Sequence, residues 1–176
     1  MDTIICKNNK YLLDSAKCSV PWLTARNKAI IALMLDSGLR QNEVCTLVKK
    51  GLDFDRGALQ VTGKGCKDRL VPLGYISKML LEDYLSQCPY KDLDYVFCGR
   101  MGNQISRNAI KVFMNRLKHQ IPFDISSHKL RHNFATNFCI DNYRRTGNTG
   151  VYDLSILMGH ESIETKIGRA SCRERV

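Results

Sequence analysis

The spacing of apolar residues in the first third of the chain predicts two consecutive helices. Between positions 25 and 37, apolar side chains fall at 29, 30, 33 and 34, which is the spacing of one helix face. Thr24 is a residue type suited to the N-cap, and Gly38 is a residue type that ends helices. A second helix is expected over 41–49, ending near Gly51.

Two short apolar runs further along predict a β-hairpin. They are ALQVT at 58–62 and RLVPL at 69–73, and both are rich in residues that favour strands. The connector GKGCKD contains two glycines and has the length of a hairpin loop. The pattern therefore predicts one hairpin over about 58–73, with lysines at its tip.

Helical spacing returns in the second half of the chain. The expected helices are 75–87, 106–120 with Ser106 as N-cap, 126–140, and 151–158 ended by Gly159. The stretch NYRRTGNTG at 142–150 has the composition of a loop. The fold class is therefore expected to be α+β, predominantly helical with a small antiparallel sheet.

Length, charge and cysteine content narrow the class of protein. A chain of 176 residues fits one domain, and its net charge of +10 favours a polyanionic partner, nucleic acid first. No run approaches the ~18 apolar residues of a membrane span, so a membrane protein is excluded. The eight cysteines are spread singly, without C-x-x-C spacing, which is typical of reduced thiols in a cytoplasmic protein without a metal centre.

Two basic residues stand at positions where chemistry is possible. Arg40 begins the second predicted helix, three residues before Glu43, and a carboxylate there can hold a guanidinium whose fork binds a phosphate. A surface ion pair has the same spacing. Lys64 lies between glycines at the hairpin tip, where a backbone without Cβ atoms allows close approach of a partner. An ammonium held there can protonate an alkoxide, and a solvated turn is the alternative.

A cluster of histidines and an arginine follows on the predicted helix 126–140. His128 and Arg131 are three residues apart, on one face near the helix N-terminus, where an anion can bind. His132 could join His128 in a metal site, but the glutamate of H-E-x-x-H and a third ligand are missing. His160 directly follows a helix-ending glycine, from which a ring can project.

Taken in order, these motifs read G-L-R-x-x-E, G-K-G, H-x-L-R-H and L-M-G-H. Together they resemble the catalytic domain of the tyrosine recombinase, or phage integrase, family over about Thr24 to Thr165. The resemblance implies DNA strand cleavage and rejoining without a metal or cofactor. In that chemistry a tyrosine attacks the DNA and stores the strand's energy as a phosphotyrosyl ester.

The resemblance also implies a role for each singled-out residue. Arg40 and Arg131 would neutralise the charge that develops on the scissile phosphate. His128 would assist proton transfer, and Lys64 would protonate the leaving 5′ oxygen. His160 would hold a phosphate oxygen. Fixed guanidiniums can replace a metal because preorganised charge is usually the largest contribution to catalysis.

The expected partner is double-stranded DNA. Lys67 and Arg69 continue the hairpin beyond Lys64 and are expected to contact it. By the resemblance, the complete protein would act on DNA as a homotetramer, and this chain is expected to be a monomer.

The nucleophile of the family is missing from its expected place. In the family the tyrosine lies nine residues beyond the histidine that matches His160, and here that position is Arg169. Tyr143 and Tyr152 both precede His160, so neither matches. We therefore expect this chain to bind DNA weakly and to cleave none.

The residues after Thr165 have no apolar stripe, and one encoding of KIGRASCRERV resembles a common sequencing adapter. We hypothesise that 166–176 is a non-native tail and that 24–165 is a catalytic domain truncated before its tyrosine. Residues 1–23 are expected to be an N-terminal remnant. Removing 167–176, with three Arg and one Glu, lowers the net charge of +10 by two and leaves the DNA argument intact.

Three other readings stay open. The chain could be a natural variant without the nucleophile, acting as a non-catalytic DNA-binding or regulatory protein on a recombinase scaffold. It could also be an enzyme that receives its tyrosine from a neighbouring subunit. A type IB topoisomerase shares much of the chemistry, but G-K-G followed by L-M-G-H favours recombinases.

Overall fold

The computed structural model describes residues 2–63 and 68–159, with side chains from residue 9 onward. The helices are α1 (Asp2–Ser15), α2 (Pro21–Asp36), α3 (Gln41–Thr46), the 3-10 turn η1 (Lys49–Gly51), α4 (Tyr75–Gln87), α5 (Arg107–Lys118), α6 (Ser127–Thr146) and α7 (Val151–Leu157); the strands are β1 (Leu52–Asp53), β2 (Ala58–Thr62) and β3 (Asp68–Pro72). The predicted α+β class, mostly helical with a small antiparallel sheet, is confirmed.

The helix α2 runs through the core. Its residues 29–34 are all buried, so it is apolar on every side rather than on one stripe. The expected N-cap was wrong: the helix begins at Pro21, whose fixed φ suits the first helical position, and Val20 stands at the cap. Thr24 instead uses its hydroxyl to bond the backbone of Cys18, both as donor and as acceptor, and so fixes the turn before the helix.

The helix α3 is shorter than expected. It ends at Thr46 instead of continuing to Lys49, and the 3-10 turn η1 takes its place over Lys49–Gly51. The chain leaves α3 through Leu47, which is extended at the C-cap, and Val48 forms an isolated bridge with Tyr95. This bridge competes with helical hydrogen bonds, which is why the helix pattern stops early.

The sheet contains the predicted hairpin and one strand that the sequence did not reveal. The strand order is β1-β2-β3, all antiparallel, with Leu59 paired to Val71 and Val61 paired to Arg69. Leu59 and Val61 are buried while Gln60 and Thr62 are exposed, so the sheet buries one face. The two-residue strand β1 is too short to show an alternating pattern.

The end of α6 corrects the predicted loop 142–150. The helix continues to Thr146, and the left-handed Gly147 (φ 73°) caps it by donating its backbone N–H to the Tyr143 carbonyl. Arg144 and Arg145 lie in the last turn, where positive charge favours the carboxyl end of a helix. The connection to α7 is therefore only 147–150.

The helix α1 was not foreseen either, although it contributes Leu12 to the core. The other expected elements are confirmed: α4 matches the predicted 75–87, α7 lies within 151–158, and α5 starts after Ser106, whose side chain accepts the Ala109 N–H. Within the described part of the chain, no helix combines the length and apolar character needed to cross a membrane.

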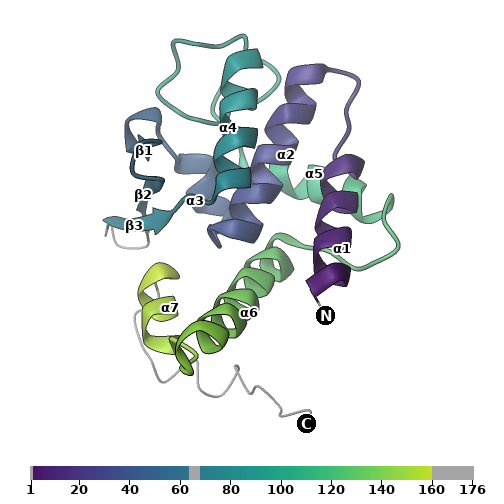
Figure 1. Ribbon diagram of the computed structural model, residues 1–176. Helices are drawn as coiled ribbons and strands as arrows, with labels where there is room; N and C mark the ends of the chain where they lie inside the picture. Colours follow the sequence, from purple (N-terminus) through teal and green to yellow (C-terminus); the bar gives the residue numbers. More distant parts are fainter. Residues whose placement is uncertain (1, 64–67, 160–176) are drawn as a thin grey trace.

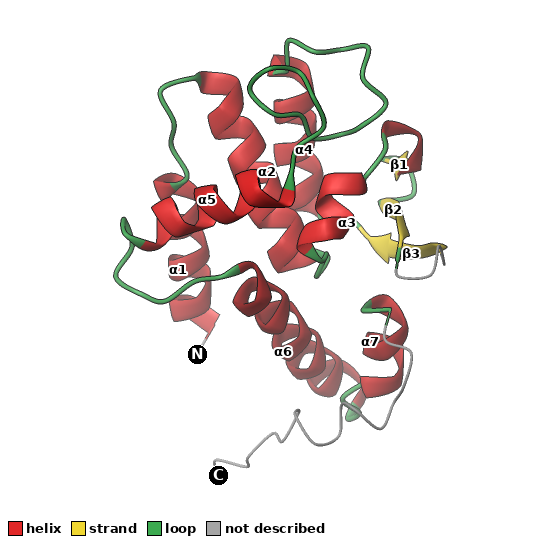
Figure 2. Ribbon diagram, turned by 180° about the vertical axis from the view of Figure 1, so that it is seen from behind, coloured by secondary structure: helices red, strands yellow, loops and turns green. Residues whose placement is uncertain are grey.

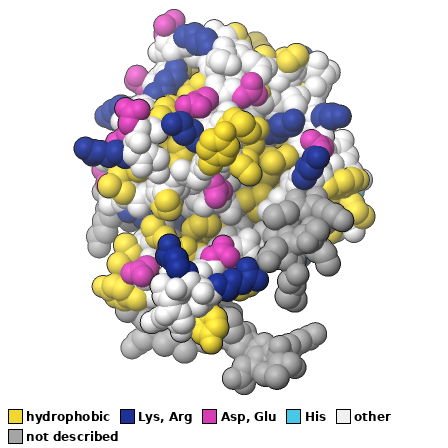
Figure 3. Space-filling view, viewed as in Figure 1, with side chains coloured by type: hydrophobic (Ala, Val, Ile, Leu, Met, Phe, Trp, Pro, Cys, Tyr) yellow, Lys and Arg dark blue, Asp and Glu magenta, His cyan; other side chains and the backbone are white. Residues whose placement is uncertain are grey.

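The elements form two parts, seen from both sides in Figures 1 and 2. The helices α1 to α5 and the sheet make the larger part, and α6 and α7 lie side by side below it, with α7 under β3. In Figure 3, Lys and Arg side chains are spread over one face with Asp and Glu between them. The positive charge of the described residues is therefore not gathered in one patch on this face.

Candidate active site

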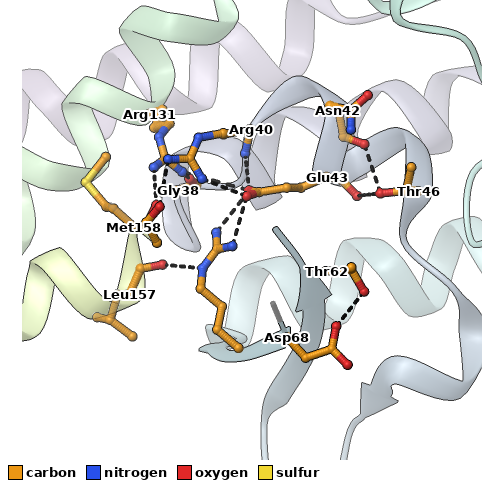
Figure 4. A network of polar contacts seen from close by, with 12 residues as sticks. Gly38, Arg40, Asn42, Glu43, Thr46, Thr62, Asp68, Arg131, Leu157 and Met158 are labelled. Atoms are coloured by element: carbon orange, nitrogen blue, oxygen red, sulfur yellow. Dashed lines mark hydrogen bonds and ion pairs between the residues drawn. The ribbon is translucent and has the colours of Figure 1, made fainter. Parts of the chain in front are cut away.

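The carboxylate of Glu43 is the centre of the site. Its side chain is only 3% exposed and lies where α3, β3 and the start of α6 meet, as Figure 4 shows. Three guanidiniums surround it: Arg40 Nη1 at 2.9 Å, Arg69 Nη1 at 2.9 Å and Arg131 Nη1 at 3.9 Å. A buried carboxylate needs such partners, because an unpaired charge there would be strongly destabilising.

Arg40 is the most accessible of the three arginines. Its side chain is 37% exposed, and it makes the expected pair with Glu43 one turn into α3. The carboxylate also accepts the backbone N–H of Arg40 at 2.7 Å, so it fixes the residue at two points. The chain reaches this position through Gly38, whose left-handed φ of 62° separates α2 from α3.

Arg131 approaches from the first turns of α6 and is nearly buried, with 8% of its side chain exposed. It donates from Nη1 to the carbonyl of Gly38, so α6 is bonded to the break between α2 and α3. Burial, and then the like charge of Arg40, lower the pKa of the Arg131 guanidinium to about 10, which leaves it protonated at neutral pH. It is therefore a fixed positive charge beside Arg40.

Arg69 completes the cluster from β3, and this position was not foreseen. It binds Glu43 through a parallel fork, with Nη1 to Oε1 at 2.9 Å and Nη2 to Oε2 at 3.0 Å. The DNA contact expected for Arg69 stays a prediction, although its side chain is only 10% exposed and its guanidinium is turned inward. The alternation of β3 held the signal, because Arg69 shares a face with the buried Val71.

The same three arginines also hold the end of α7. Three consecutive carbonyls accept from them: Leu157 from Arg69 Nε at 2.8 Å, Met158 from Arg131 Nη2 at 2.7 Å and Gly159 from Arg40 Nη2 at 3.1 Å. The last carbonyls of a helix lack partners within it and carry partial negative charge, so cations are favourable there. Figure 4 shows Leu157 and Met158 turned toward the cluster.

His128 lies one turn before Arg131 in α6 and is exposed. Ser126 caps this helix by accepting the Lys129 N–H. His132, the alternative metal ligand, is also exposed and accepts the Thr136 hydroxyl at its backbone carbonyl. Within 2–63 and 68–159, no three His, Cys, Asp or Glu side chains come together as a metal site.

Three of the expected residues lie outside the described part of the chain: Lys64, Lys67 and His160. The structure does describe what leads to them, namely the ends of β2 and β3 and the turn through Gly159. Of the sequence-predicted residues, it thus brings Arg40 and Arg131 together and places His128 on the same helix as Arg131.

The pKa of Glu43 gives the site a defined acid response. Burial alone would raise this pKa, but the hydrogen bonds from Arg69 and from the Arg40 backbone outweigh it and lower the pKa below its ordinary 4.5. A carboxyl whose folded pKa is depressed stabilises the fold above its unfolded pKa. That contribution is lost as the pH falls through the folded pKa.

We therefore expect the free energy of unfolding to fall more steeply for the wild type than for Glu43→Gln between about pH 5 and about pH 3. Urea unfolding at a series of pH values measures both slopes. Glu82→Gln is the matched control, because Glu82 is 50% exposed and only 4.0 Å from Lys78, and it should keep the wild-type slope. Equal slopes for the wild type and Glu43→Gln would contradict the expectation.

Comparison with known proteins gives a consistent result. The sequence model described as "Phage integrase family" matches residues 8–167. The tyrosine recombinase XerC of Rickettsia peacockii (strain Rustic) is 31% identical over 154 residues, and that of Rickettsia rickettsii (strain Sheila Smith) is 30% identical. Each match covers 84% of this chain and 47% of the relative, so the chain spans about half the length of these curated relatives.

Solved structures agree in fold. The crystal structure of XerA recombinase superposes with a TM-score of 0.73 at 24% identity, over 90% of this chain and 56% of that one. The XerH site-specific recombinase, solved bound to a palindromic difH substrate, gives 0.71 at 25% identity, over 90% of this chain and 46% of that one. The Tn1549 transposon integrase, in complex with circular intermediate DNA, gives 0.73 at 17% identity, over 92% and 60%.

Proposed function

Since this chain belongs to the phage integrase family of tyrosine recombinases, we propose that its arginine cluster is the scissile-phosphate site of a site-specific DNA recombinase. The observation that carries the proposal is the convergence of Arg40 and Arg131, from α3 and α6, on one buried carboxylate. Such a pair offers fixed positive charge to a phosphate, whose charge increases in the transition state.

The accessible guanidinium of Arg40 is the group that meets the phosphate first. Its Nη1 is held by Glu43, and its Nη2 contacts only the Gly159 carbonyl at 3.1 Å, at the exposed side of the cluster. Arg131 adds charge from behind. His128, one turn away on α6, supplies an imidazole for proton transfer, while Lys64 and His160 would complete the set from the hairpin and from the turn after α7.

The complete protein, in this proposal, cuts and rejoins double-stranded DNA through a phosphotyrosyl ester and assembles as a tetramer on it. The present chain carries no tyrosine after His160, so it binds DNA as a monomer and does not cleave it. Residues 24–165 are the truncated catalytic domain, and 166–176 are a non-native tail. The net charge of +10 supports DNA as the partner.

Incubation with nicked suicide substrates is expected to give no covalent protein–DNA band on a denaturing gel, because the attacking tyrosine is missing. A pool of duplexes with randomised sequence removes the need to know the target site. A covalent band from this chain would refute its inactivity. The positive control is the chain extended by its native downstream codons, recovered by resequencing the parent DNA across the codon after Thr165.

The same resequencing separates the alternatives. A genomic reading frame that lacks the tyrosine supports the non-catalytic DNA-binding protein on a recombinase scaffold. Mixing this chain with a tyrosine-bearing partner that lacks the arginines tests donation between subunits, since only donation in trans restores cleavage.

A further inference from the structure

Arg69 has no donor directed at the exposed side of the cluster. Its two Nη atoms bind the two oxygens of Glu43, and its Nε donates to the Leu157 carbonyl at 2.8 Å. With its side chain 10% exposed, a DNA phosphate could reach it only by displacing one of these partners. Its contacts therefore run inward, to the residue that orients Arg40.

We propose that Arg69 is a positioning residue that holds the Glu43 carboxylate in the orientation that presents Arg40 and Arg131, and that ties β3 to the end of α7. The proposal rests on the proposed function for the meaning of that presentation. The contacts themselves belong to the protein without DNA.

The carboxylate of Glu43 needs a fixed plane to do its work. Its Oε1 accepts from Arg40 Nη1, and its Oε2 accepts from the Arg40 backbone at 2.7 Å. Turning the carboxylate about its bond to the chain would break one contact to save the other. The parallel fork of Arg69 prevents this turn, since two simultaneous N–H···O bonds fix both oxygens, which a single ammonium cannot do.

The packing of Arg69 against Gly159 is the second part of the device. A Cβ at Gly159 would lie 3.2 Å from Arg69 Nη1 and 3.3 Å from Arg69 Cζ, and this glycine has a left-handed φ of 56°. The absence of a side chain thus lets the guanidinium lie against the turn. The strand that leads out of the hairpin and the turn that leads to His160 are joined at this point.

Nuclear magnetic resonance of protein with isotope-labelled arginine tests the proposal directly. A clamped guanidinium shows separate Nη–H signals, whereas a free one averages them by rotation. In Arg69→Met, the Arg40 and Arg131 signals are expected to broaden or merge, and in Arg69→Lys to change partially, because a lysine replaces one bond of the fork. Unchanged Arg40 and Arg131 signals in a folded Arg69→Met protein would overturn the proposal.

Arg56→Met is the matched control for this substitution. The Arg56 side chain is 86% exposed and pairs only loosely with Asp53, at 3.7 Å, so its removal should leave the cluster signals as they are in the wild type. Thermal melting of each variant confirms that the fold is retained.

A short DNA duplex then distinguishes positioning from contact. Added to the wild type, it is expected to shift the Arg40 signals more than those of Arg69, and an equal or larger shift at Arg69 would overturn the positioning role. Arg69→Met is expected to weaken duplex binding about fivefold in the wild type and less than about twofold once Arg40 is alanine, because residues acting through one another are not additive. Equal weakening in both backgrounds would overturn the role.

The two proposals fail differently. If no arginine signal of the wild type responds to the duplex, the phosphate site is contradicted. The positioning role is judged independently, on the Arg40 and Arg131 signals of the free protein.

Discussion

Replacing Glu43 with alanine is expected to lower the free energy of unfolding by about 3 to 5 kcal/mol, the largest stability effect that we anticipate in this protein. The substitution removes the one carboxylate that binds Arg40, Arg69 and Arg131. Two of these guanidiniums are nearly buried, so water cannot replace the lost partner. The remaining like charges would then repel one another at close range.

Urea unfolding measures this effect, and two variants control it. Glu43→Asp keeps the charge but shortens the side chain, so it should lose less stability than Glu43→Ala. Glu82→Gln removes an exposed carboxylate and should change the free energy of unfolding by no more than about 0.5 kcal/mol. A Glu43→Ala protein as stable as Glu82→Gln would show that the cluster is solvated and that Glu43 does not organise it.

Much of the fold follows from local sequence. The hairpin, α4 and α5 were predicted because apolar spacing, turn glycines and the Ser106 cap act within a few residues of one another. The Arg40–Glu43 pair was visible for the same reason, since three positions within one helix suffice to bring the two side chains together.

The rest depends on contacts between distant positions. Arg69 meets Glu43 across 26 positions and Leu157 across 88, and neither partner is marked in the local pattern of β3. Loop composition ended α6 too early, because Asn142 to Thr146 lack apolar spacing, yet they remain helical up to the Gly147 cap. In both cases long-range packing outweighed the local signal.

Substituting alanine for Gly38 is the second large effect expected, a loss of roughly 2 to 4 kcal/mol. One part comes from the left-handed backbone, with φ at 62°, which disfavours any Cβ. The other part is steric, since a Cβ would lie 2.3 Å from Cδ1 of Phe134, a buried ring of α6. The ring or the backbone must move, and the Gly38 carbonyl that Arg131 binds would move with it.

Gly147→Ala separates the two parts of this effect. Gly147 is also left-handed, with φ at 73°, but nothing lies within 4 Å of its would-be Cβ, so alanine there carries only the backbone cost of about 1 to 2 kcal/mol. Gly38→Ala should therefore lose at least about 1 kcal/mol more in urea unfolding, and Phe134→Leu should recover part of that difference. If both glycine variants are equally stable, α6 is not packed tightly against the break between α2 and α3. Arg131 then lacks the rigid support that brings its guanidinium to Arg40.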